Sequence, residues 1–478
     1  MNLGAGISRG SQGPRPGNRC GANLLAFSLQ PLAFRLGCLK TLAVSGLVMM
    51  FAAALFAAEN LLPQRVLYIG QRAPEFEPFL KNHFAGVHSV SRDAFKPAQA
   101  QAFDVVLLDW PQSGTTRGAW LDGAPLGRRE GWGKPTVLLG SAGLNLAVTW
   151  KVKGGAGCTC LAPVACVLRD HPIFQSPLPI DIHATTDVPM PEAFATELKS
   201  ATLPVLPLVD GIRQYHTVIN DYARGWTTYY YEFADLPEVE VFCGGINEKT
   251  PRAAAFWRQG NLLHFGFEQS PAQLNDPGRA MLVNAIVYIS RFTQDRPIDI
   301  TPSVFGPEKI ATTRERALRL FFTYPQEVPG WFSAAALAGL DRQDAPAAQA
   351  WLAAARPWLH PNSENLLEID PEARALGTPC DAPEFLPKTI AALRGEATRA
   401  RAETLLARYV YQPLGATAGA DAWEKWWREN SPYVFYSEAG GYRWYIDPLA
   451  KQRGIPTKDL RGPARADVGP AVGGPPKK

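Results

Sequence analysis

A serine between glycines, in the segment PTVLLGSAGLNLA (135–147), is the first group in this sequence that could do chemistry. Several hydrolase folds expose a nucleophile on such a turn between a strand and a helix. Ser141 can attack a substrate only if a neighbouring base takes its proton. The alternative is a tight strand-to-helix turn in which the glycines serve the backbone and Ser141 caps the helix. We favour this second interpretation.

His171 is a candidate base, because Asp170 precedes it and an aspartate beside a histidine can orient the imidazole. In the other interpretation, His171 and Pro172 close a loop through hydrogen bonds to the backbone. We favour the loop.

Polar residues also interrupt the apolar segment from Gly244 to Gln269. Asn247 and Lys249 follow a predicted buried strand, and with Arg258 and Glu268 they can line a pocket for a sugar or another polyol. They can equally form a solvated hairpin with one ion pair, and the sequence favours neither. Gln269 completes this group of candidate ligand-binding residues. No phosphate-binding loop, dinucleotide fingerprint or His-Glu-x-x-His motif is present, so we predict no cofactor and no metal.

These residues need a scaffold, and the apolar runs predict one. The segments 65–70, 104–110 and 135–140 are continuous apolar strands that alternate with helical patterns. This pattern is typical of a parallel sheet with helices on both faces. Ligand sites in such sheets lie at the carboxyl ends of the strands, where Asp109, Trp110 and Ser141 fall.

The rest of the chain divides by composition. Strand patterns with many prolines fill 160–255, two strands flank Gln259-Gly260, and a helix follows over 276–292. Beyond a proline-rich linker, Ala, Leu and Arg recur with helical period. We predict an α/β domain over 62–293, a mainly helical module with a small hairpin over 306–460, and a disordered tail over 461–478.

The module's aromatic residues have two interpretations. Trp423, Trp426 and Trp427 share one face of a predicted helix, and aromatic residues flank Glu-Ala-Gly-Gly in the predicted hairpin (433–445). Exposed aromatic rings stack on sugars, but a small domain also needs large side chains for its core. We favour the core.

The N-terminal 58 residues predict export. They carry five basic side chains and no acidic one, and Lys40 precedes an apolar run that ends in small residues. A start near Leu39 would give a compact signal peptide, and an uncleaved membrane anchor is the alternative. The chain has 48 basic and 44 acidic residues, so without this leader it is close to neutral and gives no sign of nucleic-acid binding.

The cysteines agree with an oxidising compartment. Cys158, Cys160 and Cys166 lack the spacing of a zinc site, whereas one or two disulfides are expected in an exported protein. Five cysteines follow the leader, so at least one stays free or pairs outside the chain.

Three segments resemble a known family: Asp-His-Pro-Ile (170–173), RQGNLLHFGFEQSP (258–271) and the helix ending in NAIVYI (284–289). Over 62–293 the chain is similar to the trehalose-utilisation (ThuA-like) group of the class I glutamine amidotransferase-like superfamily. The resemblance implies a flavodoxin-like sheet and a carbohydrate role. It also places Ser141 where amidotransferases have their cysteine, and Glu268 or Gln269 where they have their histidine. A glutamine cannot shuttle a proton, so the turn loses its base.

We therefore expect an exported α/β protein without catalysis at Ser141. It binds a small, sugar-like ligand or a partner protein. The alternatives are a carbohydrate-metabolism enzyme of ThuA-like type, working with His171, Glu268 or Ser141, and, with less support, a serine hydrolase. Membrane contact is expected only through an uncleaved leader.

Overall fold

The structure is a computed structural model, and residues Leu61–Lys478 form one compact unit in it. It describes residues 61–110, 125–143, 146, 150, 152, 157–158, 160–167, 170–195, 197–211, 225–230, 233–300, 311–415 and 418–461. The predicted leader and the predicted tail beyond Arg461 lie outside these residues and stay predictions, as does the division into a domain and a module.

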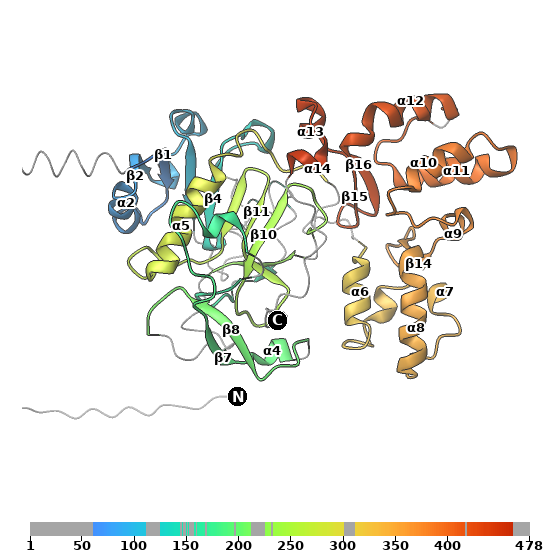
Figure 1. Cartoon of the computed structure of the whole chain (residues 1–478), viewed down its shortest axis with the longest axis horizontal. Helices are drawn as coiled ribbons and strands as arrows, with labels where there is room; N and C mark the ends of the chain where they lie inside the picture. The colour runs from blue at the N-terminus through green and yellow to red at the C-terminus, as the bar shows by residue number, and fades with distance from the viewer. Residues whose placement is uncertain are drawn as a thin grey trace, which may run out of the picture. The chain divides into compact units, whose positions relative to one another are not determined.

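A mixed sheet with helices packed against it forms the centre of the α/β part (Figure 1). Among the described residues it has twelve strands, in the order β2-β1-β3-β4-β12-β11-β10-β6-β8-β7, and β9 pairs with β11 and β5. The strands are β1 (Leu62–Ile69), β2 (Phe84–Val90), β3 (Val105–Asp109), β4 (Thr136–Leu139), β5 (Gly157–Cys158), β6 (Val164–Val167), β7 (Thr186–Pro189), β8 (Thr202–Pro207), β9 (Thr227–Tyr229), β10 (Val239–Gly244), β11 (Ala253–Gln259) and β12 (Leu262–Phe265).

The prediction of a parallel sheet is correct for β2, β1, β3, β4 and β12 and wrong for the rest of the sheet. From β12 onward, neighbouring strands run antiparallel. The reason is local, because β11 and β12 are joined by a tight turn at Gly260, whose φ is 59°. A turn this short can join only antiparallel strands.

Side chains of the parallel strands alternate between two apolar layers. Val66 and Tyr68 of β1 face one layer, whereas Leu67 and Ile69 face the other. Strands β3 and β4 alternate in the same way. Burial on both faces explains the continuous apolar runs of these strands.

Two helices complete the first of these layers. The helix α5 (Asp276–Ile289) packs against β3, β4 and β12, and α2 (Ala73–Lys81) packs against β1 and β2 (Figure 1). Asn275 begins α5 by accepting a hydrogen bond from the Gly278 amide at 3.1 Å. A short helix, α4 (Glu192–Ala195), lies between β7 and β8 in the chain.

The part after residue 311 is mainly helical, as the sequence predicts, and contains the predicted hairpin (β15–β16) and a second one (β13–β14) that was not predicted. Trp423 is buried in its core, and Trp426 and Trp427 pack partly buried against the same cluster, in agreement with the core interpretation. Its elements are α6 (Arg314–Leu320), α7 (Ala334–Leu337), α8 (Ala345–Ala355), β13 (Leu359–Pro361), β14 (Leu367–Ile369), α9 (Pro371–Leu376), α10 (Phe385–Ala392), α11 (Glu396–Tyr409), α12 (Ala420–Asn430), β15 (Val434–Ser437), β16 (Arg443–Ile446), α13 (Pro448–Arg453) and α14 (Thr457–Leu460).

A buried arginine connects the helices of this part to the β15–β16 hairpin. Arg314 donates from Nε to Glu438 Oε1 at 2.6 Å and from Nη2 to Asp381 Oδ2 at 2.7 Å. Burial would lower the pKa of Arg314, but Glu438 and Asp381 raise it above its ordinary value. The guanidinium therefore stays charged inside the fold.

We expect Arg314→Met to lower the free energy of unfolding by about 3–5 kcal/mol, because it leaves the partly buried Glu438 without its cation. Urea unfolding followed by tryptophan fluorescence measures the change. The control is Arg394→Met, which breaks exposed ion pairs with Asp421 and Glu424 and should hardly move the midpoint. Equal losses in both variants would contradict the role given to Arg314.

Candidate functional site

The turn that carries Ser141 lies directly after β4. Gly140–Ala142 form one 3-10 turn, and Gly140 has a φ of 51°. A side chain at Gly140 would place its Cβ 2.9 Å from Cβ of Glu268, so glycine is required both by the backbone and by the close approach. Ser141 is only 1% exposed. The turn is therefore tight and closed, with Glu268 packed over it.

In the described structure, the imidazole of His264 packs against the end of this turn, at Gly143. A Cβ added at Gly143 would lie 2.4 Å from Cε1 of His264, and the ring stacks on Trp257 with centroids 3.7 Å apart. Both ring nitrogens are buried and have no hydrogen-bond partner, Ser141 included. Burial lowers the pKa of His264 to about 3. His264 is thus a neutral, buried ring with the wrong geometry for a base on Ser141.

His171 closes its own loop, as the favoured interpretation predicts. Its Nδ1 accepts a hydrogen bond from the Ile173 amide at 3.1 Å, and its ring packs against Phe242 and Tyr288. Its Nε2 lies 3.7 Å from Glu240 Oε1, so the carboxylate at this imidazole is Glu240. Asp170 instead accepts a long hydrogen bond from Gln175 at 3.5 Å.

A charged cluster at the carboxyl ends of β1 and β3 joins Asp109, which the sequence analysis placed there, to Arg72 and Tyr68, which it missed. Arg72 donates from Nε to Asp109 Oδ2 at 2.9 Å and from Nη1 to the Glu268 carbonyl at 2.8 Å. Its Nη2 lies 2.5 Å from Asp109 Oδ1. Tyr68 also donates to Asp109, and burial raises the pKa of its hydroxyl far above the usual value.

This cluster ties three strand ends together. Tyr68 comes from β1, Asp109 from β3, and Glu268 follows β12, while Arg72 begins the chain segment that leads into α2. Asp109 is buried, whereas the Arg72 side chain is 22% exposed. The sequence signal for Arg72 was weak, because a single arginine after a strand has no local pattern that names its partner 37 residues away.

The other predicted ligand-binding residues, Asn247, Lys249 and Arg258, do not lie together in one site. Asn247 is buried, and its amide spans its own turn: it donates to the Gly245 and Thr250 carbonyls and accepts from the Lys249 and Thr250 amides. With four bonds its capacity is filled. Lys249 is exposed on the same turn.

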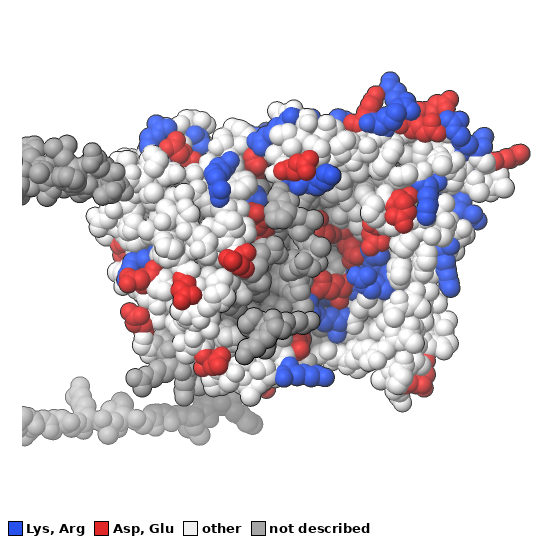
Figure 2. All heavy atoms as spheres, viewed as in Figure 1, with Lys and Arg blue, Asp and Glu red and all other residues white. Residues whose placement is uncertain are grey.

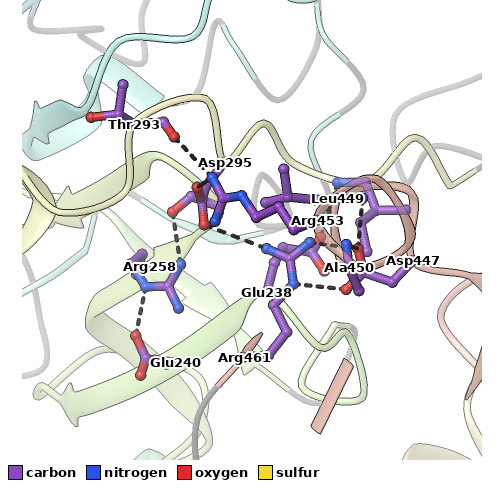
Figure 3. Close-up of polar contacts among 12 residues, drawn as sticks. Glu238, Glu240, Arg258, Thr293, Asp295, Asp447, Leu449, Ala450, Arg453 and Arg461 are labelled. Atoms are coloured by element: carbon purple, nitrogen blue, oxygen red, sulfur yellow. Dashed lines mark hydrogen bonds and ion pairs between the residues drawn. The ribbon is translucent and has the colours of Figure 1, made fainter. Parts of the chain in front are cut away.

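Arg258 is fixed elsewhere, in the core. Its Nε donates to Glu240 Oε2 at 2.5 Å (Figure 3). Its Nη1 donates to the Gly260 carbonyl at 2.8 Å, and its guanidinium lies over the Phe292 ring. Burial would raise the pKa of Glu240, but Arg258, together with hydrogen bonds from His171 and Tyr288, lowers it to about 2. We therefore assign Arg258 to this internal network.

Glu268 and Gln269 remain at the carboxyl edge beside Arg72. Both are partly exposed, and the Gln269 side-chain oxygen is buried without a hydrogen-bond partner. The candidate site of the described structure therefore consists of Arg72, Asp109, Glu268 and Gln269 around the Ser141 turn. It offers charged and amide hydrogen-bonding groups, and among the described residues neither His264 nor His171 bonds to its serine.

Cys160 is disulfide-bonded, whereas Cys166, Cys243 and Cys380 are buried free thiols, so one disulfide and several free thiols exist as the sequence allowed. The described residues contain no group of three or more His, Cys, Asp or Glu side chains that could hold a metal ion. Among the helices described, none is long and apolar enough to cross a membrane.

Comparison with protein-family models, with curated proteins and with solved structures finds no match for this chain. Its function must therefore be argued from the site itself.

The buried imidazole predicts acid sensitivity. The folded pKa of His264 is about 3, against an ordinary 6.5, so its contribution to stability is present above pH 6.5 and is lost as the pH falls toward 3. By pH 5 this loss amounts to about 2 kcal/mol. His264→Phe keeps a ring on Trp257 and should flatten the dependence, measured by urea unfolding from pH 7.5 to 4.5.

The matched control is His183→Gln, since His183 is exposed. This variant should keep the wild-type dependence on pH. An unchanged slope in His264→Phe would show that other groups cause the acid sensitivity.

Proposed function

We propose that this chain is an exported protein that binds a small polar, sugar-like ligand at the carboxyl ends of β1, β3, β4 and β12, without catalysis at Ser141. The observation that carries this proposal is the placement of the two candidate imidazoles, His264 and His171. Among the described residues, neither His264 nor His171 bonds to Ser141, because the first has unpartnered nitrogens and the second is occupied by Ile173 and Glu240.

The location of the partly exposed polar groups supports a binding role. Arg72 and Glu268 approach each other from different strands and meet at the carboxyl edge, the usual ligand position in open α/β sheets. The Arg72 guanidinium donates to Asp109 and to the Glu268 carbonyl, so it is preorganised rather than flexible. A guanidinium beside a carboxylate and an amide can donate to and accept from the hydroxyls of a polyol.

Charge gives little support to a large anionic partner. On the face shown in Figure 2, acidic and basic side chains are interspersed among the described residues, with no broad patch of one sign. Arg72 is already paired with Asp109, and Glu268 adds a second carboxylate, so the site has no excess positive charge for a polyanion. A small neutral ligand with hydroxyl groups suits it better.

The five neighbouring parallel strands support a flavodoxin-like, amidotransferase-like origin of the sheet. We extend the proposal to membership of the ThuA-like group, on the three resembling segments. The second candidate is a carbohydrate-metabolism enzyme of that type. The packing of Glu268 against Gly140 favours it, because this places one carboxylate at the turn.

Calorimetric titration with glucose, trehalose and glycerol tests the site. We expect binding of at least one probe, and a loss of about tenfold or more in affinity in Glu268→Gln and Arg72→Met, because a charge-assisted hydrogen bond contributes about 1.5–3 kcal/mol. Ser141→Ala should bind like the wild type.

Lys249→Met is the control, since Lys249 is exposed on the separate Asn247 turn. Loss of affinity in this variant alone would move the site to that turn. Turnover of any probe that depends on Glu268 would replace the binding function by the enzymatic one.

A further inference from the structure

The last described segment of the chain, residues 447–461, is held mainly by polar contacts. It contains α13 and α14, and its buried residues are Asp447, Ala450, Thr457 and Arg461. Its large aliphatic side chains are Leu449, Ile455 and Leu460. Ile455 is 39% exposed, and the two leucines are only partly buried. A segment with so little buried apolar surface opens more easily than a helix packed in a core.

Arg461 is the main polar anchor of this segment (Figure 3). Its Nε and Nη2 donate to the two carboxylate oxygens of Asp447, each at 2.8 Å. Its Nη1 lies 3.8 Å from Asp295 Oδ2, and its side chain is only 4% exposed. Asp447 in turn begins α13 by accepting hydrogen bonds from the Leu449 and Ala450 amides.

The α/β part presents buried carboxylates to this anchor. Asp295 follows α5 and also accepts from Arg453 Nη2 at 2.9 Å. Glu238 is fully buried, and its Oε1 accepts from Gln259 and from the Ile298 amide, each at 3.2 Å. Its Oε2 has no hydrogen-bond partner, and its charge acts on Arg461.

The charge balance makes Arg461 hard to replace. Three buried carboxylates, Asp295, Asp447 and Glu238, face one buried guanidinium, and Arg453 adds a second, partly exposed one. Without Arg461, Asp447 and Glu238 would lose the guanidinium that faces them, and Asp295 would keep Arg453. An uncompensated buried carboxylate is strongly unfavourable until it takes up a proton.

The same segment also contacts the helical part. Lys451 Nζ donates to Asn430 Oδ1 at 2.6 Å, and the Asp447 amide donates to the Tyr433 carbonyl at 2.8 Å. Arg453 reaches the Thr293 carbonyl at 3.3 Å, at the point where the chain leaves α5 for the linker. Residues 447–461 therefore bridge the two parts of the fold.

We infer that residues 447–461 form a strap that joins the helical part to the α/β part and opens as a local unit. Arg461 holds the strap closed through its ion pairs with Asp447 and Asp295. The strap lies near the N-terminal end of β12. Gly260, which precedes β12, packs against the backbone of Asp295, the residue that the strap contacts. The candidate ligand site lies beyond the other end of β12, so this inference does not depend on the proposed function.

Hydrogen exchange of the full chain, read by mass spectrometry, tests the strap. In Arg461→Met we expect peptides from 448–461 to exchange at least about tenfold faster, while peptides from β3 and β4 keep their wild-type rates. Arg453→Met is the control, because Arg453 is partly exposed and this variant keeps Arg461. Exchange of the 448–461 peptides should change much less in it.

The dependence on pH separates charge compensation from simple packing. In Arg461→Met, the buried carboxylates that faced Arg461 lack its counter-charge, while Arg453 still contacts Asp295. An uncompensated buried carboxylate takes up a proton more readily, so lowering the pH from 7.5 to 5.5 should restore part of the strap's protection after correction for intrinsic exchange. Protection that does not recover on acidification would overturn the role of Arg461 as counter-charge.

The wild type offers a test that does not need a folded variant. In low urea, residues 448–461 should lose protection before β3 and β4, through a separate opening with a smaller dependence on denaturant. Simultaneous loss of protection in all of these peptides, in the wild type or in Arg461→Met, would show that no strap exists.

Discussion

Burial of the parallel strands on both faces is the constraint on which the rest of the structure depends. Because β3, β4 and the second half of β1 are buried on both faces, charged groups collect where these buried stretches end. The strand β12 illustrates the result. Arg72 and Glu268 gather beyond its carboxyl end, whereas Glu238 and Asp295 gather near the turn that precedes it. The two polar clusters are therefore separated by the length of β12.

Each polar centre is organised by a buried or half-buried arginine with more than one acceptor. Arg72 connects strand ends, Arg314 connects helices to a hairpin, and Arg461 connects the end of the chain to its middle. A planar guanidinium can satisfy several acceptors in fixed directions, which a lysine cannot do. Such pairs contribute modestly to stability when compared with apolar packing, but breaking one leaves a buried charge. They therefore specify how parts of the fold meet.

Local patterns predicted what is local. The apolar runs, the helix over α5, the hairpin at Gly260 and the loop closed by His171 follow from residues that are near one another in the sequence. The sequence could not show that Arg258 pairs with Glu240, 18 residues earlier, so a polar residue in an apolar strand looked like a ligand contact. Arg72 and Arg461 were missed for the same reason, because their acceptors come from distant strand ends and loops. The antiparallel half of the sheet was missed because buried strands of either direction have the same composition.

The geometry of β12 explains why His264 does not bond to Ser141. Side chains alternate along a strand, so Leu263 and Phe265 enter the layer with α5, whereas His264 must face the opposite layer, between Trp257 and Gly143. In this position the imidazole packs against Gly143, and its ring nitrogens make no hydrogen bond. Glu268, which lies beyond the end of the strand, packs against the turn at Gly140. Among the described residues, β12 and the segment after it therefore bring a carboxylate to Gly140 and an imidazole to Gly143.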